Sequence, residues 1–313
     1  MNVFITGGTG FIGSHLAMAL ANRGDHPIIL TRSQSRVSAS LTQVAEVIEG
    51  DPTEMGSWMS HVNGCDAVVH LAGEPINAKR WDTRFRQKLA RSRIDSARYI
   101  VAAIGAASSP PRVLVSASGI DIYPFADELT QCRDLFEDSW IEEDGPKSDS
   151  FLARLCNDWE FEALAATAFE TRVVCMRTGL VLGESGPLKA MARPFRAFVG
   201  GPIGSGHQWT SWIHIEDATA AYLHALDTRS LNGAVNLVAP NPLRNREFSQ
   251  AIGKALHRPS FVSVPSFAIR LLLGDFAEYV LNGRRARSAT LPASGFKFAF
   301  PLLSDALAAL LGK

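Results

Sequence analysis

Three glycines near the start of the chain have the spacing of loops that hold phosphate groups. Gly7, Gly10 and Gly13 follow the apolar run Val3 to Thr6 and precede an amphipathic stretch, which predicts a strand, a turn and a helix. Gly7 would allow the tight turn, Gly10 would bring the backbone close to a pyrophosphate, and Gly13 would let the helix pack on the strand. These residue types therefore favour dinucleotide binding.

The predicted helix after these glycines would present its first N–H groups and the positive end of its dipole to the phosphates. A glycine-rich surface turn is the alternative, which the position between a strand and a helix disfavours. The dinucleotide-binding residues predicted in this segment are Gly7, Thr9, Gly10, Phe11, Ile12 and Gly13.

Two arginines follow the second predicted strand, where the ribose of a bound dinucleotide is expected. This strand, Pro27 to Leu30, leads into Thr31, Arg32 and, further on, Arg36. A site for NAD usually has an acidic residue here, whereas a guanidinium suits the 2′-phosphate of NADP. We therefore predict NADP as the cofactor, bound in part by Thr31, Arg32 and Arg36. Two solvated loop charges are the alternative interpretation.

Short apolar runs alternate with helical stretches along the first part of the chain. Further strands are predicted at Val44 to Glu49, Asp66 to Leu71, Arg112 to Ser116 and Arg172 to Met176, and long helices at Asp82 to Ala107 and Phe151 to Ala166. This alternation predicts an α/β fold with a Rossmann-type doubly wound parallel sheet, covered on both faces.

Ligands bind such sheets at the carboxyl ends of the strands, so residues there are candidates for the cofactor site. Asp51 is predicted to accept a hydrogen bond from an adenine amino group or, alternatively, to cap a turn. The remaining predicted cofactor-binding residues are Asp51, Leu71, Ala72, Gly73, Glu74, Ser116, Arg154 and Thr178.

The loop after the fourth strand and the helix after that loop both carry many charges. Glu74, Lys79, Arg80 and Trp81 fall on the loop, so we count them as further site candidates. The basic residues of the helix from Asp82 to Ala107 are predicted to form a solvated face instead.

The composition shifts after Gly183, where many glycines and prolines occur. We predict that residues 1–182 with 211–238 form the NADP-binding domain, and that residues 183–210 with 239–313 form a smaller C-terminal α+β substrate domain or lid. A mobile loop is expected at Gly201, Gly204 and Gly206, with Gln208 and Trp209 near the ligand.

The overall composition points to a small polar molecule as the partner. Lys plus Arg and Asp plus Glu number 31 each among 313 residues, so there is no basic footprint for nucleic acid. No apolar run reaches transmembrane length, and the eight histidines show no metal-ligand spacing with carboxylates. We therefore expect no nucleic acid, membrane or metal, and the sequence leaves monomer and homodimer open.

The cysteines and the amino terminus indicate the compartment. Cys65, Cys132, Cys156 and Cys175 form no Cys-x-x-Cys pair, which favours reduced thiols. A strand within two residues of the start leaves no room for a signal peptide. We expect a cytoplasmic protein.

Several stretches together resemble the extended and atypical short-chain dehydrogenase/reductases, the class that includes nucleotide-sugar epimerases and dehydratases. They are ITGGTGFIGSHL, HLAGEPI with KRW, SASGIDIY, RTGLVLG, GGPIGSGHQWTSWIHIEDA and ALHRPSFVSVP. The resemblance implies an NADP-binding Rossmann domain and a smaller C-terminal domain that closes over a substrate.

The resemblance also implies a catalytic Tyr-x-x-x-Lys pair with an upstream Ser or Thr, in which the lysine lowers the pKa of the phenol. Ser118 fits the hydroxyl position. The expected helix start, residues 151–156, contains neither tyrosine nor lysine. The catalytic residues we predict are Ser118 and Tyr123, with Asp121, His207 and His214 as further titratable candidates. Packing beside the nicotinamide is the alternative for Tyr123, and a structural hydrogen bond is the alternative for His214.

The absence of the Tyr-x-x-x-Lys pair leaves two functions open. The first is an NADP-dependent epimerase, dehydratase or reductase with modified chemistry. The second is a non-catalytic NADP-binding redox sensor, in which the cofactor holds a conformation that a protein partner recognises.

Overall fold

The computed structural model describes residues 1–125 and 139–312. Residues 126–138, which include Cys132, lie outside these ranges. No helix in the described residues is long and apolar enough to cross a membrane.

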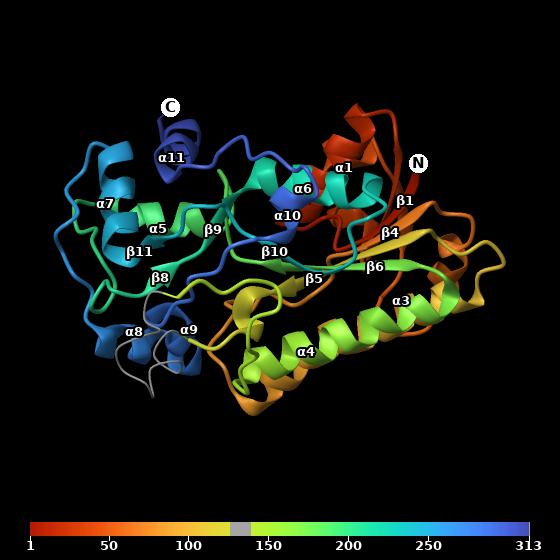
Figure 1. The fold of residues 1–313 in the computed structure, drawn as a ribbon, viewed down its shortest axis with the longest axis horizontal. Helices are drawn as coiled ribbons and strands as arrows, with labels where there is room; N and C mark the ends of the chain where they lie inside the picture. The colour runs from red at the N-terminus through yellow and green to blue at the C-terminus, as the bar shows by residue number, and fades with distance from the viewer. Residues whose placement is uncertain (126–138, 313) are drawn as a thin grey trace.

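A seven-stranded sheet in which every pairing is parallel forms the centre of the molecule (Figure 1). Its order is β10-β6-β5-β4-β1-β2-β3, so the chain reverses direction across the sheet beside β1. The predicted doubly wound sheet is confirmed. The strands are β1 Asn2–Thr6, β2 His26–Thr31, β3 Glu46–Glu49, β4 Ala67–His70, β5 Val113–Gly119, β6 Arg172–Thr178 and β10 Gly233–Leu237.

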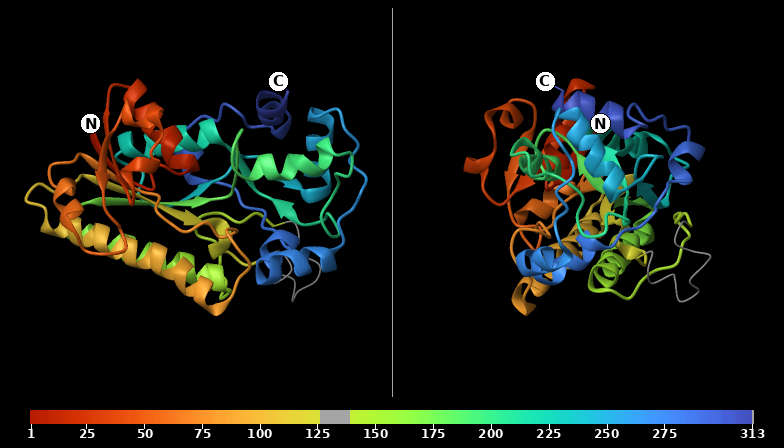
Figure 2. Two further views of the ribbon diagram at one scale, coloured as in Figure 1. Left: turned by 180° about the vertical axis from the view of Figure 1, so that it is seen from behind. Right: turned by 90° about the vertical axis from the view of Figure 1, so that its left-hand side faces the viewer.

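Helices cover both faces of this sheet. Figures 1 and 2 show α1 (Phe11–Asn22) and α6 (Ile215–Asp227) on one face, and α3 (Thr83–Ala106) and α4 (Phe151–Leu164) on the other. Successive side chains of a strand point to opposite faces of the sheet, so they enter two different apolar cores. In β1, Ile5 packs with α1 and α6, whereas Phe4 packs with α3. Both faces of the strands are buried, which explains their continuous apolar sequences.

The remaining elements lie mostly beyond one end of the sheet (Figure 1). Two short strand pairs join β7 to β9 and β8 to β11. The bounds are β7 Leu180–Leu182, β8 Trp209–Thr210, β9 Trp212–His214, β11 Leu243–Arg244, α2 Ala39–Thr42, α5 Pro187–Arg196, α7 Asn245–Ala255, α8 Ser266–Leu273, α9 Ala277–Leu281, α10 Thr290–Ala293 and α11 Leu303–Leu311. Turns of 3₁₀ helix lie at Gln34–Arg36, Ser57–Val62, Ile120–Ile122, Ala165–Phe169 and Gly274–Phe276.

The division into two domains stays a prediction, and two packing features bear on it. A separate apolar core contains Trp212, Phe248 and Leu303, which supports a second unit. Leu291 and Phe296 instead pack with the core of the large sheet. Part of the C-terminal segment therefore returns to the large sheet.

A buried histidine at the end of β4 ties the sheet to α3. The ring of His70 is fully buried; its Nδ1 lies 2.6 Å from Thr6 Oγ1 and its Nε2 lies 3.1 Å from Ser96 Oγ. Burial lowers the pKa of His70 to about 3. The imidazole is therefore neutral in the folded protein.

We expect His70 to make the fold less stable as the pH falls from about 6.5 toward 3. The unfolded chain binds a proton in this window and the folded chain does not, so each pH unit removes up to about 1.4 kcal/mol of the free energy of unfolding. Denaturant unfolding of His70→Asn should show a flatter pH dependence than that of His26→Asn, whose side chain is exposed. Equal slopes in the two variants would contradict the assignment.

Candidate functional site

The glycine-rich turn between β1 and α1 has the tight geometry that its sequence predicts. Gly7 has φ +70°, and a Cβ there would lie 2.7 Å from the carbonyl of Leu71 and 2.8 Å from Ala72 N. A Cβ on Gly13 would lie 2.3 Å from Gly7 O. The roles of Gly7 in the turn and of Gly13 in close helix packing are confirmed. A Cβ on Gly10 would meet only Gly7 O, at 3.1 Å. The backbone at Gly10 is therefore open to a ligand.

A cavity of about 300 Å³, the smaller of two described here, opens directly over this turn. It lies at the point where the chain direction reverses across the sheet, the usual ligand position in this architecture. The predicted cofactor residues that line it are Gly7, Thr9, Gly10, Thr31, Arg32, Arg36, Asp51, Leu71, Ala72, Gly73 and Glu74. Sequence reasoning missed Leu30, Ser33, Pro52, Thr53, Pro75 and Ser92, which line it as well.

The charges around this smaller cavity differ in how they are paired. Glu74 forms an ion pair with Lys88, at 3.0 Å. Asp51 Oδ1 accepts hydrogen bonds from the N–H of Thr53, at 2.8 Å, and from its Oγ1, at 2.7 Å, which fits the predicted turn cap. Arg32 and Arg36 are exposed and form no ion pair with any described residue. The two guanidinium groups are therefore available to an anion.

Several predicted cofactor residues lie outside both cavities. Ser116 is 1% exposed, and its Oγ donates to Ala117 O, at 3.3 Å. Arg154 lies on the exposed face of α4. Neither side chain lines a cavity, because strand and helix periodicity turn both away from the ligand edge, and their contact with the cofactor stays a prediction. Phe11 packs against Gly183 and Gly186, and Phe11, Ile12 and Gly13 form the first turn of α1.

A larger cavity of about 660 Å³ adjoins the smaller one, and Pro75 lines both. This volume is typical of small-molecule sites. Its walls combine the ends of β5 and β6 with one face of α4, a residue of α3 and two segments far along the chain. They include Arg93, Ser118, Asp121, Leu152, Leu155, Cys156, Trp159, Thr178, Gln208, Trp209, Tyr279 and Arg284. The predicted candidates Ser118, Asp121 and Thr178, and the expected neighbours Gln208 and Trp209, are thus brought together.

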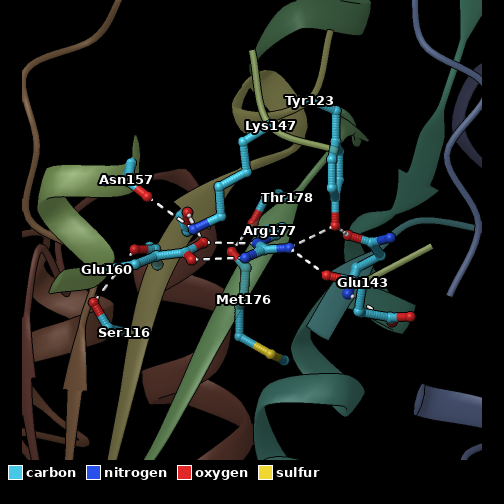
Figure 3. Close-up of polar contacts among 12 residues, drawn as sticks. Ser116, Tyr123, Glu143, Lys147, Asn157, Glu160, Met176, Arg177 and Thr178 are labelled. Carbon is cyan, nitrogen blue, oxygen red and sulfur yellow. Dashed lines mark hydrogen bonds and ion pairs between the residues drawn. The ribbon is translucent and has the colours of Figure 1, made fainter. Parts of the chain in front are cut away.

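Ser118 has a hydroxyl of defined orientation in the wall of the larger cavity. Its Oγ donates to Glu160 Oε1, at 2.7 Å. Glu160 in turn accepts two hydrogen bonds from Arg177, each at 2.8 Å, and both side chains are about 5% exposed (Figure 3). Burial alone would lower the pKa of Arg177, but the hydrogen bonds and charge of Glu160 raise it. The buried ion pair thereby fixes the carboxylate that orients Ser118.

Tyr123 does not lie in the cavity, contrary to the prediction. It is fully buried, its hydroxyl donates to Asn236 Oδ1, at 2.8 Å, and it accepts from Arg177 Nη1, at 2.7 Å (Figure 3). Burial raises the pKa of Tyr123 to about 12, although Arg177 opposes the shift. The 3₁₀ turn at Ile120–Ile122 directs the chain inward, so the phenol joins the core.

The two histidine candidates also lie outside the cavities. His214 is buried, and its Nδ1 accepts from Glu216 N, at 3.2 Å, as the cap of α6. Burial lowers the pKa of His214. His207 is exposed. The structural alternative therefore describes His214 better than a catalytic role.

Two arginines and a tyrosine of the larger cavity, Arg93, Arg284 and Tyr279, were not predicted from the sequence. Arg93 was included in the solvated face of its helix, and Tyr279 and Arg284 lie far along the chain from Ser118. Tyr279 Oη accepts from Leu152 N, at 3.1 Å, and burial raises the pKa of Tyr279. Arg284 Nη1 donates to Asp121 Oδ1, at 3.0 Å. No local spacing could have joined these residues.

Family comparisons cover most of the chain. The model of the NAD dependent epimerase/dehydratase family matches residues 3–237, and a domain of unknown function, DUF1731, matches residues 264–310. Among curated proteins, the chloroplastic SDR39U1 homologue of Arabidopsis thaliana is 37% identical over 99% of this chain and 87% of its own. Epimerase family protein YfhF of Bacillus subtilis is 33% identical over 99% of this chain and 98% of its own.

Solved structures agree with these matches. The human epimerase family protein SDR39U1, crystallised with NADPH, has a TM-score of 0.87 and 32% identity over 100% of both chains. A nucleoside-diphosphate sugar epimerase from Corynebacterium glutamicum has a TM-score of 0.77 and 26% identity over 100% of this chain and 58% of that one. This chain belongs to the NAD-dependent epimerase/dehydratase family, in the epimerase-like group with an additional C-terminal domain.

Proposed function

We propose that this chain binds NADP(H) and uses it to oxidise or reduce a small polar substrate, as an epimerase, dehydratase or reductase with an altered active site. The observation that carries the proposal is the junction of the two cavities at Pro75. The smaller one has a glycine turn and free arginines, and the larger one has the oriented hydroxyl of Ser118. The NADPH in the human SDR39U1 structure supports the choice of cofactor.

The residues of the smaller cavity fit the phosphate-rich half of NADP(H). Gly10 leaves the backbone open at the start of α1, where free N–H groups favour a pyrophosphate. Arg32 and Arg36 would hold the 2′-phosphate, and Asp51 would face the adenine. The nicotinamide would extend past Pro75 into the larger cavity, where the bound cofactor would supply or accept a hydride.

We expect the wild-type protein to bind NADPH more tightly than NADH. A charge-assisted contact with a phosphate contributes about 1.5–3 kcal/mol, which corresponds to roughly ten- to a hundredfold in affinity. Arg32→Asp should remove most of this preference in calorimetric titrations of both cofactors.

Arg229→Asp is the control for this experiment, because it makes the same charge change at an exposed residue outside both cavities. It should leave the preference for NADPH intact. Equal affinities of the wild-type protein for the two cofactors would refute the assignment of Arg32 and Arg36.

The chemistry that we propose for the larger cavity depends on Ser118. Because its proton points to Glu160, the lone pairs of Oγ remain for a hydroxyl proton of the substrate. When the substrate is oxidised, its hydroxyl would pass its proton to Ser118 Oγ, and Ser118 would pass its hydroxyl proton to Glu160. When the substrate is reduced, both proton transfers would run in the opposite direction. Arg177 compensates the carboxylate charge in the resting state.

The face of α4 that lines the larger cavity carries Leu152 and Cys156 at the spacing of a Tyr-x-x-x-Lys pair. Leucine has no ionisable group, and burial raises the pKa of the Cys156 thiol to about 12, so the thiol stays neutral. This observation favours a second candidate function, a redox sensor that binds NADP(H) without turning over a substrate.

A further inference from the structure

Arg93 differs from every other charged residue that lines the larger cavity. The three charged residues in its walls are Arg93, Asp121 and Arg284. Asp121 and Arg284 form an ion pair, at 3.0 Å, so their charges compensate each other. No carboxylate in the described ranges forms an ion pair with Arg93. The lining of the cavity therefore carries one uncompensated positive charge.

The contacts of Arg93 leave most of its hydrogen-bonding capacity unused. Toward the residues that the structure describes, only Nη1 donates, in long hydrogen bonds to Leu89 O, at 3.3 Å, and to Ser92 Oγ, at 3.4 Å. The guanidinium lies over the ring of Trp159, 5.3 Å from its centroid. A guanidinium has five N–H donors, so Nε and Nη2 remain for a further partner. This contact with the Trp159 ring restrains the guanidinium for that partner.

The position of Arg93 is at the junction of the two cavities. A Cβ on Gly73, which lines the smaller cavity, would lie 3.2 Å from Arg93 Cζ. The side chain is partly buried, and burial lowers the pKa of Arg93. An arginine nevertheless keeps its charge in a protein. A partly desolvated cation without a counterion is costly, and an anionic ligand would remove that cost.

We propose that the larger cavity takes an anionic substrate, one with a carboxylate or phosphate group, and that Arg93 binds this group. The inference rests on the proposed function, because it names the class of substrate for the same site. A bidentate contact from Nε and Nη2 matches the geometry of both anions. The anion on Arg93 would hold the rest of the molecule in the cavity that Ser118 lines.

The test uses simple anions on protein saturated with NADP⁺, so that the phosphate sites of the smaller cavity are already filled. Thermal unfolding is followed with acetate, with its neutral isostere acetamide, and with inorganic phosphate, each up to tens of millimolar. We expect acetate or phosphate to stabilise the wild-type protein and acetamide not to do so. The more effective anion identifies the carboxylate or the phosphate as the natural group.

Two variants locate the effect. Arg93→Gln should weaken anion binding by about ten- to a hundredfold, while Arg91→Gln, an exposed residue on the same helix, should not change it. If the glutamine variant does not fold, Arg93→Lys keeps the charge and should retain part of the response without the bidentate geometry.

Three results would overturn the proposal. The first is that acetate and acetamide stabilise the wild-type protein equally, and the second is that Arg93→Gln leaves the response to anions unchanged. The third is that Arg93→Gln loses so much NADPH affinity that this loss alone explains its weaker response to anions, which would assign Arg93 to the cofactor. A wild-type protein that binds no NADPH would refute the proposed function instead, and the anion comparison would then be made without cofactor.

Discussion

Replacing Glu160 by glutamine is expected to lower the free energy of unfolding by about 3–5 kcal/mol, because it leaves the guanidinium of Arg177 buried without its carboxylate. Arg177 is 4% exposed and donates to both carboxylate oxygens of Glu160, each at 2.8 Å. Tyr123 Oη and Glu143 O accept from the same guanidinium but carry no full charge. Neither can replace the lost carboxylate.

Glu162→Gln is the matched control, two residues further along α4. Glu162 forms an ion pair with Arg98, whose side chain is 54% exposed. Pairs of this kind contribute about 0–1 kcal/mol. Urea unfolding of the two variants should therefore separate them by several kcal/mol, and equal midpoints would contradict the structural role of the Glu160 pair.

A double variant tests whether the penalty comes from the unpaired charge. Glu160→Leu combined with Arg177→Met removes both charges and leaves apolar side chains of similar volume. Its loss of stability should be much smaller than the sum of the two single losses, because no isolated charge remains buried. A fully additive loss would show that the two side chains stabilise the fold independently.

The parts of the site that the sequence predicted are those determined by local geometry. Gly7 and Gly13 are needed where β1, the turn and α1 approach within van der Waals distance, and Arg32 follows β2 directly. Each of these positions follows from one strand and the turn after it. The doubly wound sheet was predictable for the same reason, since short apolar strands and longer helices alternate in the sequence.

The parts that the sequence could not predict depend on packing between distant segments. Arg93 belongs to a helix with many basic residues, and only the docking of α3 beside α4 decides which of them faces the cavity. Tyr279 reaches the start of α4 from the far end of the chain. Glu160 is an acidic residue on a helix face that periodicity would assign to apolar contacts, and its burial depends on Arg177 from a strand.

Tyr123 and Ser118 show the limit of reading chemistry from sequence neighbours. They lie five residues apart, yet the turn between them sends one side chain into the cavity wall and the other into the core. Side-chain direction after a strand depends on the turn that follows, which composition does not specify. The assignment of chemistry therefore has to begin from the cavity.

Ser118→Ala is expected to slow hydride transfer by about 10²–10⁴, the usual effect of losing a positioned acid–base group. It removes the only link between the larger cavity and Glu160 that we propose for proton transfer, and it leaves the cofactor contacts of the smaller cavity untouched. NADPH affinity should therefore stay unchanged. The measurement is single-turnover oxidation of bound NADPH by a panel of small aldehydes, ketones and sugar acids, followed by its absorbance.

Ser116→Ala provides the control for this prediction, because it removes a hydroxyl from the same strand, two residues away and outside both cavities. It should turn over at the wild-type rate. If Ser118→Ala transfers hydride as fast as Ser116→Ala, the chemistry does not depend on Ser118. If the wild-type protein binds NADPH tightly and no compound oxidises it, the larger cavity, with Leu152 and Cys156 in its wall, belongs to a sensor. Anions that bind Arg93 would then act as signals.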